Sequence, residues 1–201
     1  MRILNTRKQG GFTLIEMIVS LAIFTVVAVV AIGALLRVMD ANRKSINLKT
    51  AINNMNFVLE SMSREMRVGS KYSCESNDVG AVNQNYPIKN CSGETDGTWT
   101  LVFTSSRRDP SNSCNLIFAY RLSNGVLQKG EQTTCGNPIN DGSNSVFYTL
   151  SDPNVNITSS RIEVNNDDQP YAKFFIKGDV GIKNKEKTEF TVQTMVSQRI
   201  K

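Results

Sequence analysis

The chain has 201 residues, of which 40% are hydrophobic and 20% charged; this suits one globular domain with an appendage and excludes wholesale disorder. Three of its net +5 charges (Arg2, Arg7 and Lys8) precede the first apolar run, so the later side chains carry about +2, and nucleic acid is a possible partner that charge does not indicate. Histidine is missing, and with it the commonest general base and metal ligand, so we expect neither an enzyme nor a bound cofactor.

The first predicted element is an apolar helix over residues 12–36, which holds a single charge, Glu16. Such a helix is roughly 37 Å long and can cross the ~30 Å hydrocarbon core of a bilayer. The short basic flank predicts a cytoplasmic N-terminus and an exported C-terminal side. An ordinary signal anchor and a conventional signal peptide are alternatives. However, a conventional signal is cleaved after its apolar region, whereas the small pair Gly10-Gly11 precedes it here.

Residues 7–16 read RKQGGFTLIE and lead directly into the unbroken apolar run. This combination resembles the class III signal of type IV prepilins and of type II secretion pseudopilins. The resemblance implies cleavage between Gly11 and Phe12 by a membrane prepilin peptidase, followed by N-methylation of the new Phe12 amine. It also implies three further partners: membrane lipid before assembly, an inner-membrane assembly platform, and other pilin or pseudopilin subunits.

Glu16 requires a separate explanation, because a carboxylate in a membrane helix costs about 2.5–3.5 kcal/mol. Within one subunit the Phe12 amine points along the helix axis rather than towards Glu16. The resemblance implies that Glu16 meets the Phe12 amine of a neighbouring subunit; a tolerated charge near the membrane surface is the alternative. Major pilins usually carry a helix-breaking proline in this segment, and residues 12–68 have none, which favours a minor pilin or a pseudopilin.

The helical pattern continues beyond residue 36. Apolar or small residues recur in steps of four and three, in a heptad-like stripe that includes one polar member: Ala34, Val38, Ala41, Ser45, Leu48, Ile52, Met55, Leu59, Met62 and Met66. Gly69 is a stop signal, so one helix is predicted over residues 12–68. A coiled coil is possible, but the strand-rich sequence that follows favours packing of this stripe against a sheet.

All four cysteines (Cys74, Cys91, Cys114 and Cys135) fall on the side predicted to be exported, where disulfides persist. Asn124-Gly125 predicts a two-residue type I′ hairpin turn. In that register Cys114 faces Cys135 at a non-hydrogen-bonded position, with Cα atoms about 4.5 Å apart. Elimination then pairs Cys74 with Cys91. A zinc site is the alternative, although no C-x-x-C spacing supports it, and we predict no metal site.

Beyond this hairpin, strands are predicted at residues 99–105, 145–150, 157–164, 171–177 and 188–199. The cluster at residues 165–168 reads NNDD and predicts a turn, with a calcium loop as the alternative. Residues 73–98 are polar and rich in glycine and asparagine, and we expect an exposed recognition loop there.

The predicted fold class is therefore α+β: a long N-terminal helix, transmembrane in its first half, packed against a mainly antiparallel β-sheet in a pilin-like lollipop. The expected divisions are a cytoplasmic leader (1–11), a transmembrane and filament-core helix (12–36), its extension (37–69) and an exported head (70–201). The helix end and the hairpin also resemble J-type minor pseudopilins and similar minor pilins. The predicted function is a minor pilin or pseudopilin subunit of a type IV pilus-like or type II secretion filament. A non-polymerising membrane-anchored binding module is the alternative, and an anchored hydrolase is disfavoured.

Overall fold

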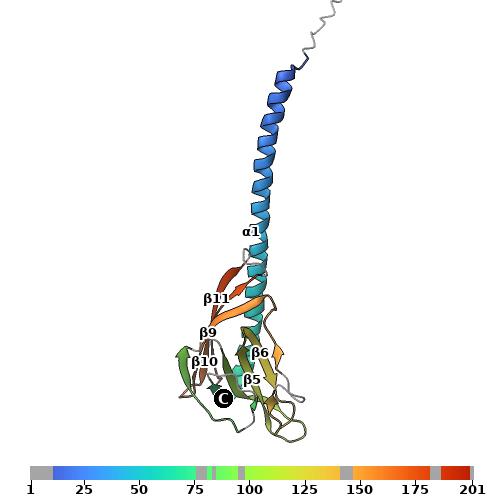
Figure 1. The fold of residues 1–201 in the computed structure, drawn as a ribbon. Helices are drawn as coiled ribbons and strands as arrows, with labels where there is room; N and C mark the ends of the chain where they lie inside the picture. Colours follow the sequence, from blue (N-terminus) through green and yellow to red (C-terminus); the bar gives the residue numbers. More distant parts are fainter. Residues whose placement is uncertain are drawn as a thin grey trace, which may run out of the picture. The chain divides into compact units, whose positions relative to one another are not determined.

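The computed structural model describes residues 11–75, 81–82, 85–94, 98–140, 147–181 and 187–199. The protein divides into two compact units, Met1–Arg43 and Lys44–Lys201. In the described part, the first unit is helical from Leu14 onwards, and the second contains the end of the same helix and all the strands (Figure 1). This confirms the predicted α+β fold class.

Helix α1 (Leu14–Val68) is continuous through Gly33 and ends at the residue that the sequence predicted. Six of its residues are buried, all in the second unit: Ala51, Met55, Val58, Leu59, Met62 and Met66. Leu48 and Ile52 pack against the same core. The predicted stripe is therefore confirmed from Leu48 onwards, and it covers a sheet. Its earlier members (Ala34, Val38, Ala41 and Ser45) are exposed, because no sheet residue lies over them among the described residues.

Gly69 follows the last residue of α1 without the left-handed conformation that the sequence suggested, and the close packing around it leaves no room for a side chain. A side chain at Gly69 would lie 2.6 Å from the Phe103 ring and 3.2 Å from the Thr104 carbonyl oxygen. The left-handed backbone occurs two residues later, at Lys71, with φ 57°. The buried Tyr72 hydroxyl donates a hydrogen bond to the Met66 carbonyl at 2.5 Å and so satisfies one of the last helical acceptors.

The larger sheet has five strands in the order β1-β4-β5-β6-β8. They are β1 (Ser70–Glu75), β4 (Trp99–Arg108), β5 (Asn115–Ser123), β6 (Val126–Glu131) and β8 (Tyr148–Thr149). The β5–β6 hairpin has the predicted register, from Ser123↔Val126 outwards to Phe118↔Glu131. Asn124 and Gly125 have φ 51° and 74°, which confirms the positive φ values of a type I′ turn.

A second sheet has four strands in the order β11-β10-β9-β3. They are β11 (Thr188–Ser197), β10 (Tyr171–Val180), β9 (Val155–Asn165) and β3 (Cys91–Glu94), and a separate pair joins β2 (Ala81–Val82) to β7 (Ile139–Asn140). The cluster at residues 165–168 forms the turn between β9 and β10, where the Asn165 side chain accepts the Asp167 N–H at 2.6 Å. All ladder pairings are antiparallel.

The expectation of a loop over residues 73–98 is partly wrong. Both ends of this segment are strands, because Ser73 and Cys74 are buried in β1 beside β4, and β3 pairs with β9. Between them, the Tyr86 hydroxyl donates to the Lys71 carbonyl at 2.7 Å. Residues 76–80, 83–84 and 95–97 of the expected loop lie outside the described residues. These polar strands are short, so their sequences show no clear period-2 pattern.

One hydrophobic core joins the helix end to both sheets. Trp99 of β4 is fully buried, and its indole N–H donates to the Ser160 hydroxyl of β9 at 2.9 Å. Its ring lies 5.8 Å from that of Phe174 on β10. A smaller cluster covers the other face of the larger sheet, so that β5 is buried on both faces.

Both disulfides have the pairing that the sequence favoured. Cys74–Cys91 connects β1 of one sheet to β3 of the other, with Cα atoms 6.1 Å apart. Cys114–Cys135 has a Cα separation of 6.4 Å, so the expected ladder position at about 4.5 Å is wrong. The reason is that β6 ends at Glu131 and Cys135 lies in the turn that follows.

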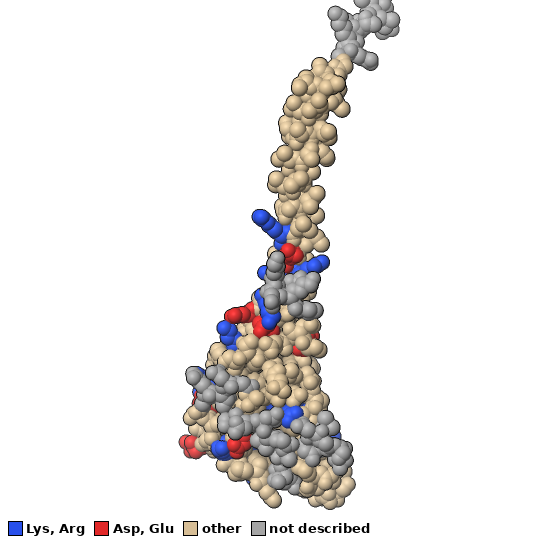
Figure 2. Space-filling view, viewed as in Figure 1, with Lys and Arg blue, Asp and Glu red and all other residues tan. Residues whose placement is uncertain are grey.

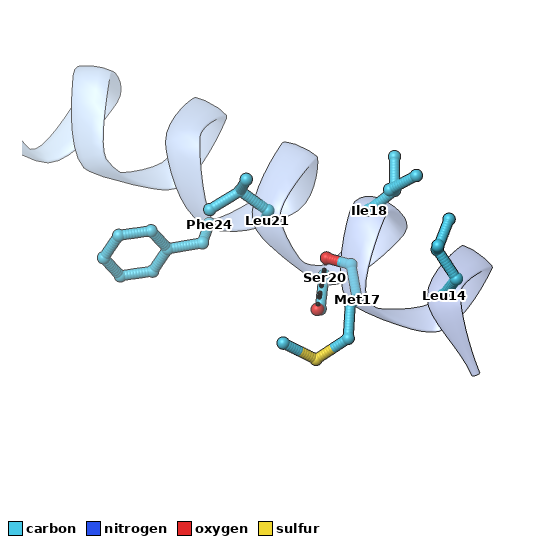
Figure 3. Close-up of a pocket in the computed structure, with 6 residues that line it drawn as sticks. All are labelled: Leu14, Met17, Ile18, Ser20, Leu21 and Phe24. Atoms are coloured by element: carbon cyan, nitrogen blue, oxygen red, sulfur yellow. Dashed lines mark hydrogen bonds between the residues drawn. The ribbon is translucent and has the colours of Figure 1, made fainter. Parts of the chain in front are cut away.

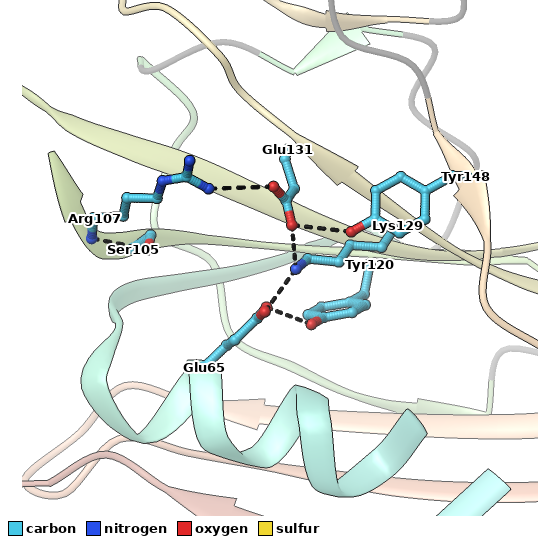
Figure 4. Close-up of polar contacts among 7 residues, drawn as sticks. All are labelled: Glu65, Ser105, Arg107, Tyr120, Lys129, Glu131 and Tyr148. Carbon is cyan, nitrogen blue, oxygen red and sulfur yellow. Dashed lines mark hydrogen bonds and ion pairs between the residues drawn. The ribbon is translucent and has the colours of Figure 1, made fainter. Parts of the chain in front are cut away.

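A half-buried charge network fixes the end of α1 to the larger sheet (Figure 4). The Lys129 side chain is only 6% exposed, and its Nζ lies 2.6 Å from Glu65 on the helix and 2.5 Å from Glu131. The Tyr120 hydroxyl donates to Glu65 at 2.6 Å, and the Tyr148 hydroxyl donates to Glu131 at 2.9 Å. Burial alone would lower the pKa of Lys129, but the hydrogen bonds and charges of the two glutamates outweigh it and raise that pKa.

This network predicts acid sensitivity. Burial would raise the pKa of Glu131, but the hydrogen bonds from Lys129 and Tyr148 outweigh it and hold the pKa below the ordinary value of 4.5. A lowered carboxyl pKa contributes stability that is complete above about pH 4.5 and is lost as the pH falls through the folded-state pKa. We therefore expect the thermal midpoint of the protein to fall below about pH 4.5, and to fall less steeply in Glu131→Gln. An equal slope in both proteins would contradict this role of Glu131.

The hairpin turn supports a second stability prediction. A side chain at Gly125 would have a strained positive φ and would also meet the Asn156 side chain at 2.5 Å. Gly136 has φ 88° but open space around it, so Gly136→Ala is a matched control for backbone strain alone. Left-handed φ costs an ordinary residue roughly 1–2 kcal/mol. In urea unfolding we expect Gly125→Ala to lose more stability than Gly136→Ala; an equal loss would show that Asn156 simply moves away.

Candidate functional site

Gly11 and Phe12 precede the helix and are exposed. Phe12 is 80% exposed, and a side chain at Gly11 would meet nothing within 4 Å. Neither residue belongs to a helix or strand, so the peptide bond between them takes part in no helical or β-sheet hydrogen bonding. Residues 1–10, which include Arg7, Lys8 and Gly10, lie outside the described residues.

Thr13 is the N-cap of α1, a role that the sequence analysis missed. The Thr13 hydroxyl accepts the Glu16 backbone N–H at 3.4 Å, and the Thr13 carbonyl accepts the Met17 N–H at 3.2 Å. Threonine followed three residues later by glutamate is the capping-box pattern, which was readable in the sequence. The structure shows one of the two hydrogen bonds that define such a box. Thr13 therefore fixes where the helix starts and places Glu16 in its first turn, where the helix dipole favours a negative charge.

The surface beyond Glu16 is apolar. Figure 3 shows Leu14, Met17 and Phe24 among the side chains that line a shallow hollow along the helix, and Figure 2 shows no charged atom on the visible face of its first turns. Two hydroxyls interrupt this surface, and both donate back to their own helix: Ser20 to the Met17 carbonyl at 3.0 Å and Thr25 to the Leu21 carbonyl. Such bonds remove the need for an outside partner in lipid.

The Glu16 carboxylate, unlike these hydroxyls, is not satisfied by a hydrogen bond within its own helix. Within the described part of the protein, its carboxylate makes no hydrogen bond and no ion pair. It is the one acidic group in the apolar segment, and the Ser20 hydroxyl one turn away donates to the Met17 carbonyl instead. By length and composition α1 qualifies as a membrane-spanning helix, and its most apolar window is not buried within the protein.

A family model described as the prokaryotic N-terminal methylation motif matches residues 6–32. This protein has a type IV prepilin-like signal. This prepilin-like signal covers Gly11, Phe12, Thr13 and Glu16 together with most of the apolar run. It is typical of a structural subunit that a peptidase processes and that assembles with other pilin subunits, and with α1 it fits a membrane-anchored pilin. No curated protein and no solved structure matches this sequence.

One further cluster resembles a metal site by composition. Ligand atoms of Asp109, Cys114 and Cys135 lie within 4.8 Å of one another. Both sulfurs belong to a disulfide, and the Asp109 carboxylate accepts the backbone N–H groups of Cys135 at 2.8 Å and Ser111 at 2.7 Å. These hydrogen bonds lower the pKa of Asp109. The cluster therefore closes the loop around the disulfide and does not offer free thiolates to a metal.

Proposed function

We propose that this protein is a minor pilin or pseudopilin subunit of a type IV pilus-like or type II secretion filament. It matures by cleavage between Gly11 and Phe12 and by methylation of the Phe12 amine, and it assembles through Glu16 and the apolar part of α1. One combined observation supports this proposal. The prepilin-like signal leads into the exposed apolar part of α1, and the one carboxylate in that part, Glu16, is unpaired within the described residues.

The proposed assembly contact follows from the position of the charges. Cleavage before Phe12 creates an amine just ahead of the Thr13 cap, whereas Glu16 projects sideways from the first turn. A charge pair in a low-dielectric environment is strong only when both groups approach closely. A second subunit, displaced along its neighbour, brings its Glu16 carboxylate to the first subunit's Phe12 amine and also covers the apolar surface. One contact then neutralises both charges.

The subunit type is the finer part of the proposal. The continuity of α1 through Gly33, without a proline, supports a minor subunit. The resemblance of residues 59–67, of the Tyr120-Arg121-Leu122 hairpin and of the closing strand to J-type minor pseudopilins and similar minor pilins also supports a minor subunit. In this proposal residues 1–11 are the cytoplasmic leader, residues 12–36 cross the inner membrane and then enter the filament core, residues 37–69 extend the helix, and residues 70–201 form the exported head.

The experiment that tests maturation is the intact mass of the protein purified from its native membrane. We expect a polypeptide that begins at Phe12 and carries one added methyl group. Gly11→Leu is expected to keep residues 1–11, because a bulky side chain then stands at the bond to be cut. A wild-type protein that retains Met1 would contradict the proposed maturation.

Filament membership is tested separately, by shearing cells and probing the filament fraction for this protein. We expect co-purification with filaments, at low abundance because the subunit is minor. Recovery of correctly processed protein in the membrane fraction alone would favour the non-polymerising anchored module instead.

A further inference from the structure

A basic groove lies beside the C-terminal end of α1, within the second unit. It has a volume of about 900 Å³ and is formed where the helix end, the end of β4, the β9–β10 turn and the end of β11 meet. Residues that line it include Arg67, Arg108, Arg199, Ser105, Asn115 and Asp168. Three arginines from three distant segments thus line one groove, and Asp168 is the one acidic residue among the described residues that line it.

The backbone fixes these three segments relative to one another. The Arg199 N–H donates to the Arg67 carbonyl at 2.9 Å, and the Gln198 N–H donates to the Pro170 carbonyl at 2.8 Å. Arg108 is the last residue of β4 and pairs with Asn115 of β5. Backbone hydrogen bonds therefore hold the segments that form the groove in place.

The three arginines differ from their neighbours in their partners. Arg64 pairs with Glu60 at 3.0 Å, and Arg107 pairs with Glu131 at 3.6 Å. Among the described residues, by contrast, no carboxylate forms an ion pair with Arg67, Arg108 or Arg199. The helix dipole favours a cation at Arg67, but it does not account for Arg108 at the end of β4 or for Arg199, which follows β11. Three like charges that line one groove repel one another, and an anion bound among them relieves that repulsion.

The lining indicates which anion fits. Guanidinium groups bind carboxylates through two parallel hydrogen bonds, and hydroxyl and amide groups on the wall can complete the coordination. A single-stranded nucleic acid would require aromatic side chains for base stacking, and none lines this groove among the described residues. We propose that the groove lined by Arg67, Arg108 and Arg199 binds the acidic side chains of a partner protein segment.

The test uses the full mature protein in zwitterionic detergent micelles and a fluorescein-labelled peptide of sequence Glu-Gly-Glu-Gly-Glu. Fluorescence anisotropy is expected to show binding that weakens with salt. The triple variant Arg67→Gln/Arg108→Gln/Arg199→Gln is expected to bind at least about tenfold more weakly, since each lost charge-assisted contact contributes strongly to affinity. Arg64→Gln removes the same charge from the adjacent helix turn and is expected to change the affinity less than about twofold.

Two further probes make the result decisive: the Gln-Gly-Gln-Gly-Gln peptide and an oligothymidylate of equal charge. No binding of the acidic peptide, equal binding of the glutamine peptide, or unchanged binding by the triple variant would each overturn the proposal. Tighter binding of the oligothymidylate would overturn it in favour of a nucleic-acid surface. The three arginines are exposed, and circular dichroism of the triple variant checks that the fold is kept. The inference does not depend on filament assembly, so it can fail while the proposed function stands.

Discussion

Replacing Glu16 with leucine is expected to leave the protein in the membrane but to remove it from the filament. The substitution deletes a charge whose insertion costs about 2.5–3.5 kcal/mol, so membrane insertion becomes no harder. The same substitution leaves the Phe12 amine of the neighbouring subunit without a partner. Truncating one member of a buried charge pair costs about 2–5 kcal/mol. The amount in sheared filaments should therefore fall by more than about tenfold, as measured by immunoblotting against the membrane fraction.

Two control variants separate charge from shape and from polarity. Glu16→Gln keeps the size of the side chain and loses its charge, and it should fail like Glu16→Leu. Ser20→Ala removes a polar group one turn away whose hydroxyl already donates to the Met17 carbonyl, so it should assemble normally. Wild-type filament levels in Glu16→Leu would show that the carboxylate is only tolerated near the membrane surface, and the assembly contact would be wrong.

Replacing Lys129 with methionine is expected to cause the largest loss of stability in the second unit. Lys129 is held between Glu65 and Glu131, and its removal leaves two partly buried carboxylates facing each other. Breaking a buried ion pair costs about 3–5 kcal/mol, and the lower end applies because both carboxylates retain some exposure. Urea unfolding of the mature protein in detergent, followed by tryptophan fluorescence from the buried Trp99, measures the change.

The matched control is Lys173→Met. Lys173 also pairs with a glutamate, Glu163 at 3.2 Å, but its side chain is 39% exposed. Exposed ion pairs contribute less than about 1 kcal/mol, so this variant should stay close to wild type. Adding Glu65→Gln to Lys129→Met should restore part of the loss, because it removes one unpaired charge. If Lys129→Met lost no more stability than Lys173→Met, the network would not anchor the helix end.

Local signals explain what the sequence predicted correctly. The apolar run and the Asn124-Gly125 turn each depend on neighbouring residues, so the long helix and the register of the hairpin could be derived from the sequence. The prepilin-like signal depends on local order in the same way, and the family model matches it at residues 6–32. Even the missed Thr13 cap is a local pattern.

The short polar strands and the charge pairing of the second unit, by contrast, could not be derived from local sequence patterns. Strands β1 and β3 are short and polar, and each becomes a strand because a longer strand accepts its backbone hydrogen bonds. Lys129 had no sequence feature that marked it as buried, because its position depends on Glu65, which lies 64 residues earlier. The same holds for the arginine groove, whose members come from three separate elements.

The sequence alone therefore determined that this protein has a prepilin-like signal and an apolar N-terminal helical segment with one acidic residue, followed by a disulfide-bonded β-rich region. Only the tertiary structure decided how Cys74–Cys91 joins two sheets, which charges are paired and which arginines converge. The physical reason is range: periodicity, capping and turn chemistry act within a few residues, whereas burial and charge pairing depend on segments that only folding brings together.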